Sequence, residues 1–494
     1  PTSTEGPGSP ESASGNEAAA VLNGLYAALP VANGVKEVAT AEELTDALAD
    51  SSISIITLKD DVEISSTLTV NRTVTLDLNG NVLKMTGSDS VIKVEADGDL
   101  TIQDRNTTTQ HTFNPHCKYQ FWYIDMWELD KDGSEIVSGG VITGGGGDQN
   151  NGGGVLVAGG TLTMAGGSIV GCSARSRGGG VYLGKDSDTG KSGTFIMTSG
   201  SIIGCAAQLG GGVYVTSGCT FVMATSSNIH NCIANNDGGG VINHGTFQMR
   251  GGTISTCTTV AFGGGGVCNN GTFIMSDGMI KGCTSPDGQY ASGGGVRNSN
   301  QFTMTGGMIG DPDNENDASH VYNTSSQETT LTISGNAKIY TDITNVGILN
   351  ADGGEIAGTM TNDTNRYGTG SEGAAGSTEF HGKVTNTGTI RKGTFKNEVI
   401  NESSGTINGG TFTGAITNND GMVLDGDFSG ATLNGMLVIT FDPNNGDQPS
   451  TQKVNWSKDG AALTAPDPVP TNEGHSIEGW YYDNNGTETK WNFD

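Results

Sequence analysis

The sequence of 494 residues has little positive charge, since 24 Lys and Arg face 53 Asp and Glu, for a formal net charge of −29. This balance repels phosphate backbones, so nucleic acid is excluded as an expected partner. No apolar run is long enough to span a bilayer, and we therefore expect no membrane insertion. Proline is scarce, with 12 residues. Collagen-like and proline-rich chains are thereby excluded.

Glycine is abundant, with 80 residues, and its positions reveal a repeat. A Gly-Gly-Gly-Val block recurs with its valine at Val155, Val181, Val213, Val241, Val267 and Val296. A second block has a large apolar residue followed by Met two positions later: Leu162/Met164, Phe195/Met197, Phe221/Met223, Phe247/Met249, Phe273/Met275 and Phe302/Met304. Isoleucines supply the third block. The unit is about 26 residues, with three short strands and three turns.

One unit of this size cannot form a core alone, because each strand has only two or three inward side chains. Stacked units place like residues on one another about 4.8 Å apart. The sequence therefore predicts an all-β fold, a right-handed parallel β-helix of about 14 coils. A β-propeller needs four strands per blade, and leucine-rich repeats need a Leu spacing that is missing.

Three regions are predicted along the chain. Residues 1–35 resemble a flexible lead or linker, and residues 36–436 form the β-helix, which narrows after Asp317 because the units shorten. Thr40 and Glu43 form a capping box that predicts a short N-terminal capping helix over residues 41–49. Residues 437–494 form a small C-terminal β-rich, β-grasp-like module, whose core we assign to its three tryptophans: Trp456, Trp480 and Trp491.

Two columns of polar or reactive side chains follow from the repeat. Asparagine stands two residues after the Val or Ile of the later units: Asn243, Asn269, Asn298, Asn323, Asn345, Asn386, Asn401 and Asn418. Because stacked amides can bond along the axis, we predict an asparagine ladder. Five cysteines share another register, which ends at Pro312: Cys172, Cys205, Cys232, Cys257 and Cys283. We expect reduced, stacked thiols, with partial disulfides or a metal site as alternatives.

Two parts of the sequence resemble known families. Residues 36–435, with the stretch Leu76-Asp77-Leu78-Asn79-Gly80, resemble the pectin-lyase-like right-handed β-helix of bacterial surface proteins. The C-terminal segment, with Phe441-Asp442-Pro443-Asn444-Asn445-Gly446 and Gly479-Trp480-Tyr481, is similar to the internalin-type B-repeat, or Listeria–Bacteroides repeat. The resemblance implies a cell-surface or secreted bacterial protein, often an adhesin.

Catalytic signals are weak. Hydrolysis of a glycan needs paired carboxylates, but the adjacent pair Asp60 and Asp61 is better interpreted as a turn. A lyase needs calcium-binding acids beside a base, and none of the basic residues has an acidic residue at a matching position of the repeat. The basic candidates are therefore assigned to solvated corners or structural roles: Arg175, Arg177, Arg250, Arg297, His230 and His244. The acidic loop 311–317 offers oxygen ligands, and structural Ca²⁺ is the alternative to a plain turn; we expect no other cofactor.

An insert at residues 105–137 is the candidate ligand site. It contains Phe121, Trp122, Tyr123 and Trp127, and exposed aromatic rings can stack on sugars or dock a partner. The alternative is that the insert folds back and covers the flank of the helix. Substituting Trp122 and Trp127 separates the two.

The sequence thus predicts a non-catalytic extracellular protein, at the bacterial cell surface or secreted, that adheres to or recognises a glycan, host or matrix ligand. A polysaccharide lyase or glycoside hydrolase on the same fold, and a purely structural spacer, are the alternatives. The chain starts at Pro1. We expect a mature, monomeric part of a longer surface polypeptide.

Overall fold

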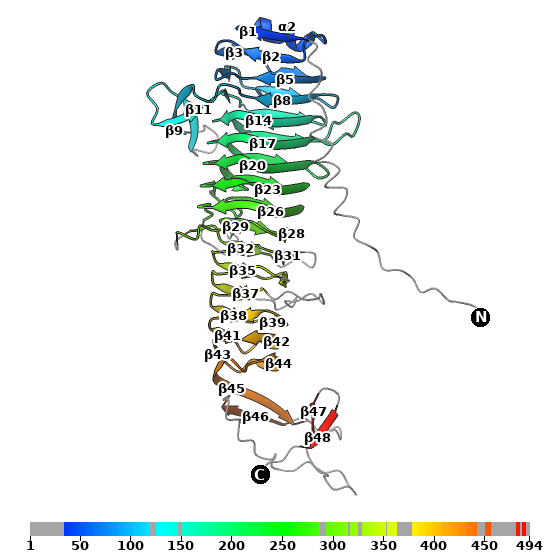
Figure 1. Cartoon of the computed structure of the whole chain (residues 1–494), viewed down its shortest axis with the longest axis vertical. Helices are drawn as coiled ribbons and strands as arrows, with labels where there is room; N and C mark the ends of the chain where they lie inside the picture. Colours follow the sequence, from blue (N-terminus) through cyan, green and yellow to red (C-terminus); the bar gives the residue numbers. More distant parts are fainter. Residues whose placement is uncertain are drawn as a thin grey trace, which may run out of the picture.

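The chain is a parallel β-helix, as the sequence predicts. The computed structural model describes residues 34–118, 125–146, 151–286, 293–314, 317–324, 329–351, 353–362, 378–441, 450–455, 481–484 and 487–490. Figure 1 shows the strands stacked along one long axis. The predicted lead up to residue 33 and the three C-terminal tryptophans lie outside the described residues.

One face of the stack, called sheet B, has a single strand in each coil. Its 16 strands pair in chain order, and all are parallel except β46 (Ser450–Asn455). The others are β4 (Leu68–Val70), β7 (Ile92–Val94), β13 (Val155–Ala158), β16 (Val181–Gly184), β19 (Val213–Val215), β22 (Val241–Asn243), β25 (Val267–Asn269), β27 (Val296–Asn298), β30 (Val321–Asn323), β33 (Ile343–Asn345), β36 (Met360–Asn362), β38 (Val384–Asn386), β41 (Val399–Asn401), β43 (Ala415–Asn418) and β45 (Thr432–Phe441).

The broader face, sheet A, has 23 strands in two rows. Strands of about ten residues cross both rows: β14 (Thr161–Val170), β17 (Thr194–Ile203), β20 (Thr220–His230), β23 (Thr246–Ser255) and β26 (Thr272–Lys281). The shorter strands before them are β1 (Val35–Val38), β2 (Ile55–Leu58), β3 (Val62–Ile64), β5 (Thr73–Asp77), β6 (Val82–Met85), β8 (Asp99–Gln103) and β12 (Val141–Thr143). Those after them are β28 (Gln301–Met304), β29 (Met308–Ile309), β31 (Thr330–Ile333), β32 (Lys338–Ile339), β34 (Ile348–Ala351), β35 (Glu355–Ile356), β37 (Glu379–Phe380), β39 (Thr389–Ile390), β40 (Thr394–Phe395), β42 (Thr406–Phe412) and β44 (Met422–Asp427).

A third, four-stranded sheet lies in the middle coils of the described structure, and we call it the corner sheet. It consists of β15 (Ser173–Arg177), β18 (Ala206–Leu209), β21 (Ile233–Asp237) and β24 (Thr258–Thr259). The Gly-Gly-Gly blocks that begin at Gly178, Gly210, Gly238 and Gly264 turn the chain from this sheet into sheet B. The first glycine of the block at Gly210 has φ +66°, where a side chain would be strained, so the predicted role of these glycines as corners is confirmed.

The helix α2 (Ala41–Ala49) lies at the N-terminal end of the stack, beside β1 (Figure 1). The backbone N–H of Glu43 donates to Thr40 Oγ1 at 3.2 Å, which confirms the predicted cap. The helix buries Leu44 and Ala47. At its other end Arg72 donates to the carbonyl oxygens of Ala47 and Leu48, both at 2.9 Å. The open end of the core is thereby covered.

Like side chains stack along the interior. The rings of Phe195, Phe221, Phe247, Phe273 and Phe302 have centroids 4.9, 4.8, 4.8 and 4.4 Å apart and are nearly parallel. The predicted stacking of Phe on Phe is therefore confirmed. A second stack, which the sequence analysis missed, lies in the shorter coils: Phe380, Phe395, Phe412 and Phe428.

The asparagine ladder is confirmed and has one more member, Asn362. Each side-chain Nδ2 donates to the Oδ1 of the next asparagine at 2.7 to 2.9 Å, from Asn243 to Asn418. The first members are 26 and 29 residues apart, and the last are 15 and 17 apart. The predicted narrowing is thus confirmed, and Figure 1 shows it below β26.

The five column cysteines are free and buried. Their thiols donate to isoleucine carbonyls of the preceding coil at 3.7 to 3.9 Å, and burial raises the pKa of Cys232 and Cys257 well above the ordinary value. The prediction that Pro312 takes the sixth position of the cysteine column is wrong. Ser319 takes that position instead, next to Gly295, and its hydroxyl accepts a hydrogen bond from the backbone N–H of Cys283 at 2.9 Å.

The last described coil changes its pairing within one strand. Residues 432–435 of β45 pair with β43 in parallel, and residues 436–441 pair with β46 in antiparallel. The change falls beside the predicted boundary at residue 436. Beyond it the structure describes a further hairpin, β47 (Tyr481–Asn484) and β48 (Thr487–Lys490).

Replacing an interior ladder residue, Asn323→Ala, is expected to lower the free energy of unfolding by about 2 kcal/mol. The substitution leaves buried partners unpaired, because Asn323 accepts from Asn298 and donates to Asn345 at 2.8 Å. Chemical denaturation measures the loss. The control Asn243→Val should cost less, since it extends the apolar column of Val157, Leu183 and Val215 above it. Equal losses would contradict a cooperative ladder.

Candidate functional site

The aromatic insert forms a small antiparallel sheet on the flank of the stack (Figure 1). In it, β9 (Gln110–Lys118) pairs with both β10 (Asp125–Leu129) and β11 (Glu135–Ser138). Phe121, Trp122 and Tyr123 lie outside the described residues, so their role in ligand binding stays a prediction.

Trp127 is packed against the β-helix rather than presented to solvent. Its side chain is 7% exposed and lies in a cluster with Phe113 and Ile203. Its backbone N–H donates to Gly204 O at 3.1 Å, and its ring meets His230 edge-on at 6.3 Å. Trp127 is therefore not part of an exposed aromatic platform. Its position agrees with the alternative prediction, in which the insert covers the flank of the helix.

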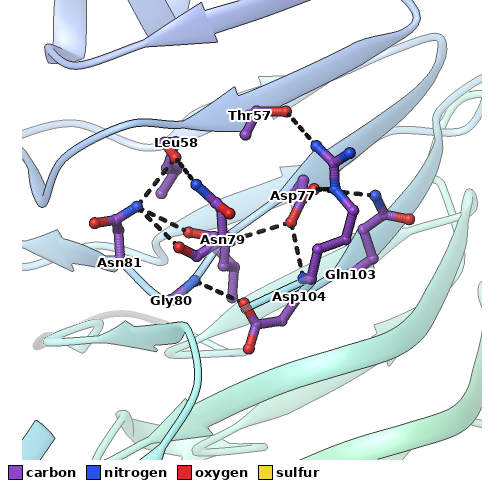
Figure 2. Close-up of polar contacts among 10 residues, drawn as sticks. Thr57, Leu58, Asp77, Asn79, Gly80, Asn81, Gln103 and Asp104 are labelled. Carbon is purple, nitrogen blue, oxygen red and sulfur yellow. Dashed lines mark hydrogen bonds and ion pairs between the residues drawn. The ribbon is translucent and has the colours of Figure 1, made fainter. Parts of the chain in front are cut away.

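A polar corner among the N-terminal coils contains Asp77, Asn79 and Gly80 of the Leu76–Gly80 motif (Figure 2). Asp77 is fully buried, and its carboxylate accepts from the backbone N–H groups of Asn79 and Arg105 at 3.0 and 3.2 Å. Gln103 and the Arg105 Nε complete its shell, and Arg105 also donates to Thr57 Oγ1 at 3.2 Å. Each oxygen of Asp77 is therefore committed to holding neighbouring coils together.

Asp104 has the same kind of role. Its two carboxylate oxygens accept hydrogen bonds from the backbone N–H groups of Gly80 at 2.7 Å and Gly140 at 2.8 Å. Asp104 therefore links the polar corner to the segment that follows the insert. Asp61 accepts from the N–H of Val82 at 2.8 Å, which agrees with the predicted turn role. These carboxylates bind backbone donors, and this arrangement favours structure over acid–base chemistry.

In the acidic loop, Asp317 is 6% exposed and accepts the backbone N–H groups of Gly282, Asp311 and Ser319 at 2.8 to 3.0 Å. Asp311 pairs with Lys281 at 2.9 Å. These contacts support the predicted turn. Within the described part of the chain, no three His, Cys, Asp or Glu side chains are grouped to hold a metal ion.

A second candidate site lies on the outside of sheet B, next to the corner sheet. We call it the tyrosine–arginine face and define it as Arg177, Tyr182, Tyr214, Asp237, His244 and Arg297. Tyr182 and Tyr214 lie outside the central core, because the residues that alternate with them in β16 and β19 are buried in it. Tyr182 is half-buried, and Tyr214 is 7% exposed and belongs to a small outer cluster with Ile242 and Cys268. The two tyrosine rings stack at 5.5 Å, and the His244 ring follows at 5.5 Å. The Arg177 guanidinium lies 5.3 Å from the centre of the Tyr214 ring, a cation–π contact.

The other end of the face holds an ion pair. Arg297 projects from β27, and its Nη1 lies 3.9 Å from the Asp237 carboxylate at the end of β21. Cys268 is buried beneath the pair, and burial raises its pKa to about 12. The thiol is therefore protonated and unreactive at neutral pH.

Partial burial shifts the ionisable groups of the face. Burial raises the pKa of Tyr182 and Tyr214, against the opposing effect of Arg177. Burial, and then the charge of Arg177, lowers the pKa of His244, so its ring is neutral at pH 7. Burial also raises the pKa of Asp237, which Arg297 opposes.

The sequence analysis missed this face. It found no acidic residue at repeat positions matching those of the basic residues, and the pair of Arg297 with Asp237 joins two positions that do not match in the repeat. The glycine corners bring the ends of corner-sheet strands beside the outer residues of sheet B, so Arg297 reaches Asp237 in an earlier coil. A signal was present: Tyr182, Tyr214, Ile242, Cys268 and Arg297 each follow a block valine directly.

The described structure is thus a parallel β-helix in which the carboxylates named above mostly accept hydrogen bonds from the backbone. Residues 35–144 match the family model of a pectate lyase-like adhesive domain, and residues 438–494 match the Listeria-Bacteroides repeat domain. Both resemblances drawn from the sequence are confirmed. Searches of curated proteins and of solved structures gave no match. Domains of these two kinds are typical of extracellular or surface proteins, and no helix among the described residues is long and apolar enough to cross a membrane.

Gly204→Ala is expected to displace the insert, because a Cβ there would lie 2.1 Å from Trp127 Cγ. The matched control is Gly282→Ala, whose φ of +60° is similar to the +57° of Gly204 but whose added Cβ would lie 3.6 Å from Thr256 Cγ2. Both variants bear the same backbone strain. Tryptophan fluorescence should shift to the red in the first alone; identical spectra would show that Trp127 is not docked.

Proposed function

We propose that the protein is a non-catalytic extracellular adhesin that recognises a glycan or host-matrix ligand on the outside of its β-helix. The match of residues 35–144 to a pectate lyase-like adhesive domain carries this proposal. The protein acts as a monomeric part of a longer surface polypeptide, and its stacked coils hold the binding surface away from the Listeria-Bacteroides repeat.

The tyrosine–arginine face supports the proposal because it combines the two kinds of group that glycans use. Tyr182 is half-buried, and its ring offers apolar area to the C–H faces of sugars, whereas Tyr214 is 7% exposed and supports it from the neighbouring rung. Arginine, histidine and a carboxylate at its borders offer donors and acceptors to hydroxyl groups. These groups stand on strands of a rigid stack, except for His244, which directly follows β22, so little side-chain freedom is lost on binding.

The non-catalytic part of the proposal is supported by the acids described above. Asp77, Asp104 and Asp317 are engaged by backbone or arginine donors, and Asp237 faces Arg297. A lyase or hydrolase would release unsaturated or reducing ends from the polysaccharide that the protein binds. Incubation of the full chain with each bound glycan, followed by an assay for such ends, would overturn this part if ends accumulate.

Tyr182→Ala is expected to weaken glycan binding roughly tenfold, since an aromatic contact contributes about 1 kcal/mol or more. A glycan array identifies the ligand, and titration calorimetry measures the change. Tyr322→Ala is the matched control, because Tyr322 occupies the same outer column four rungs beyond Tyr214. If both variants bind as the wild type does, the face is not the site.

The insert is the second proposed contact, through Phe121, Trp122 and Tyr123. Trp122→Ala should reduce binding and leave the melting temperature unchanged, whereas Trp127→Ala should lower the melting temperature by removing a packed ring. Calorimetric melting and the array together separate these effects. A large loss of stability in Trp122→Ala would instead assign that residue to covering the flank.

A further inference from the structure

The C-terminal end of the stack is only partly covered by the described residues. In the inner column of sheet A, Ile390 and Ile407 are buried, but the next member, Val423, is half-buried. In sheet B, Ile416 is fully buried, whereas its partner Leu433 is half-buried. The N-terminal end differs, because the helix α2 covers it. A stack of repeats needs a cap at each end, since an uncovered end leaves part of the core in water.

The last strand of sheet A, β44, also has apolar side chains on its outer face. Met422 is 56% exposed and Leu424 is 61% exposed. In the two coils before it, Thr389 and Thr406 occupy the outer column that Met422 continues. Among the described strands β44 pairs with β42 alone, so no described strand lies along its other edge. Exposed apolar side chains on a strand with an open edge indicate a surface that another segment covers.

The order of the strands along the chain identifies that segment. In the preceding coils, the chain after a sheet B strand supplies the next strand of sheet A, since β42 follows β41 and β44 follows β43. After β45 the chain enters the Listeria-Bacteroides repeat instead, which begins at residue 438. The repeat therefore starts where the next coil would continue. Its tether to the last coil gives it a high effective concentration at the uncovered end.

The residues that lead into the repeat already contact the β-helix. Leu437 packs against the central core, and the Met436 carbonyl accepts a hydrogen bond from the side chain of Asn418, the last asparagine of the ladder. Both Met436 and Leu437 lie in the half of β45 that pairs with β46 in antiparallel. Figure 1 shows β45 and β46 at the end of the stack, after β44. This hairpin thus begins to close the end from the side of sheet B.

We propose that the repeat, residues 438–494, docks on β44 and on the half-buried ends of the two sheets, and so forms the C-terminal cap of this β-helix. Its apolar side chains cover Met422, Val423 and Leu424 and exclude water from the end of the core. The repeat and the last coils then open as one unit, because each buries apolar surface of the other. This role is independent of adhesion.

Hydrogen exchange of the full chain, followed by mass spectrometry, tests the proposal. A docked repeat protects the backbone of β44. Leu424→Lys should speed exchange in β44 and in β46 together by at least tenfold, because a lysine charge at the contact opposes docking. The matched control is Ile274→Lys, which changes an exposed apolar residue of β26, far from both ends of the stack. It should leave exchange in both strands as in the wild type.

Three results would contradict the proposal. The first is exchange in wild-type β44 as fast as in a free edge strand, and the second is a response of β44 to Leu424→Lys that leaves β46 unchanged. The third concerns a competing occupant: a wild-type dimer that Leu424→Lys converts to a monomer, measured by light scattering, would place a second copy of the chain on β44. If Leu424→Lys does not fold, Met422→Lys repeats the test, and unchanged exchange there overturns the proposal.

Discussion

Hydrogen bonding between parallel coils is the constraint on which the rest of this structure depends. Each strand pairs with the equivalent strand of the next coil, so every side chain lies about 4.8 Å above the equivalent side chain. Only groups that attract their own kind are stable in such columns. Phenyl rings stack, aliphatic chains pack, amides donate and accept, and thiols donate to carbonyls. Charges repel their own kind, which explains a sequence with few charged and many small residues.

The asparagine ladder shows how this constraint makes a buried polar group favourable. Every amide from Asn243 to Asn418 both accepts and donates within the column, except at the ends. Above Asn243 the same column is apolar, with Val157, Leu183 and Val215. The change coincides with the approach to the narrower coils, where less apolar area is available per rung and hydrogen bonds hold the coils in register.

The surface is less regular than the core, and its irregular positions are the functional candidates. Tyrosine, isoleucine, cysteine and arginine succeed one another along a single outer column of sheet B, whereas the inner column that begins at Val155 keeps valine as far as Val321. An outward position has no stacking requirement, because solvent or a ligand satisfies it. Under the proposed function, binding specificity would lie on the outer columns and on inserts, while the core holds them rigidly.

The sequence by itself determined the columns: the β-helix, its corner glycines, the phenylalanine stack, the ladder, the capping helix and the two family resemblances all follow from residue spacing. It missed Asn362, because residues inserted before Asn386 broke the period, and it placed Pro312 where Ser319 lies, because the turn beyond Ile309 is longer than in earlier coils. Only the tertiary structure decided that Trp127 packs on Gly204, that Arg177 covers Tyr214 and that Arg297 faces Asp237. Those contacts join different sheets across a corner, and a periodic pattern carries no information on which side chains a corner brings together.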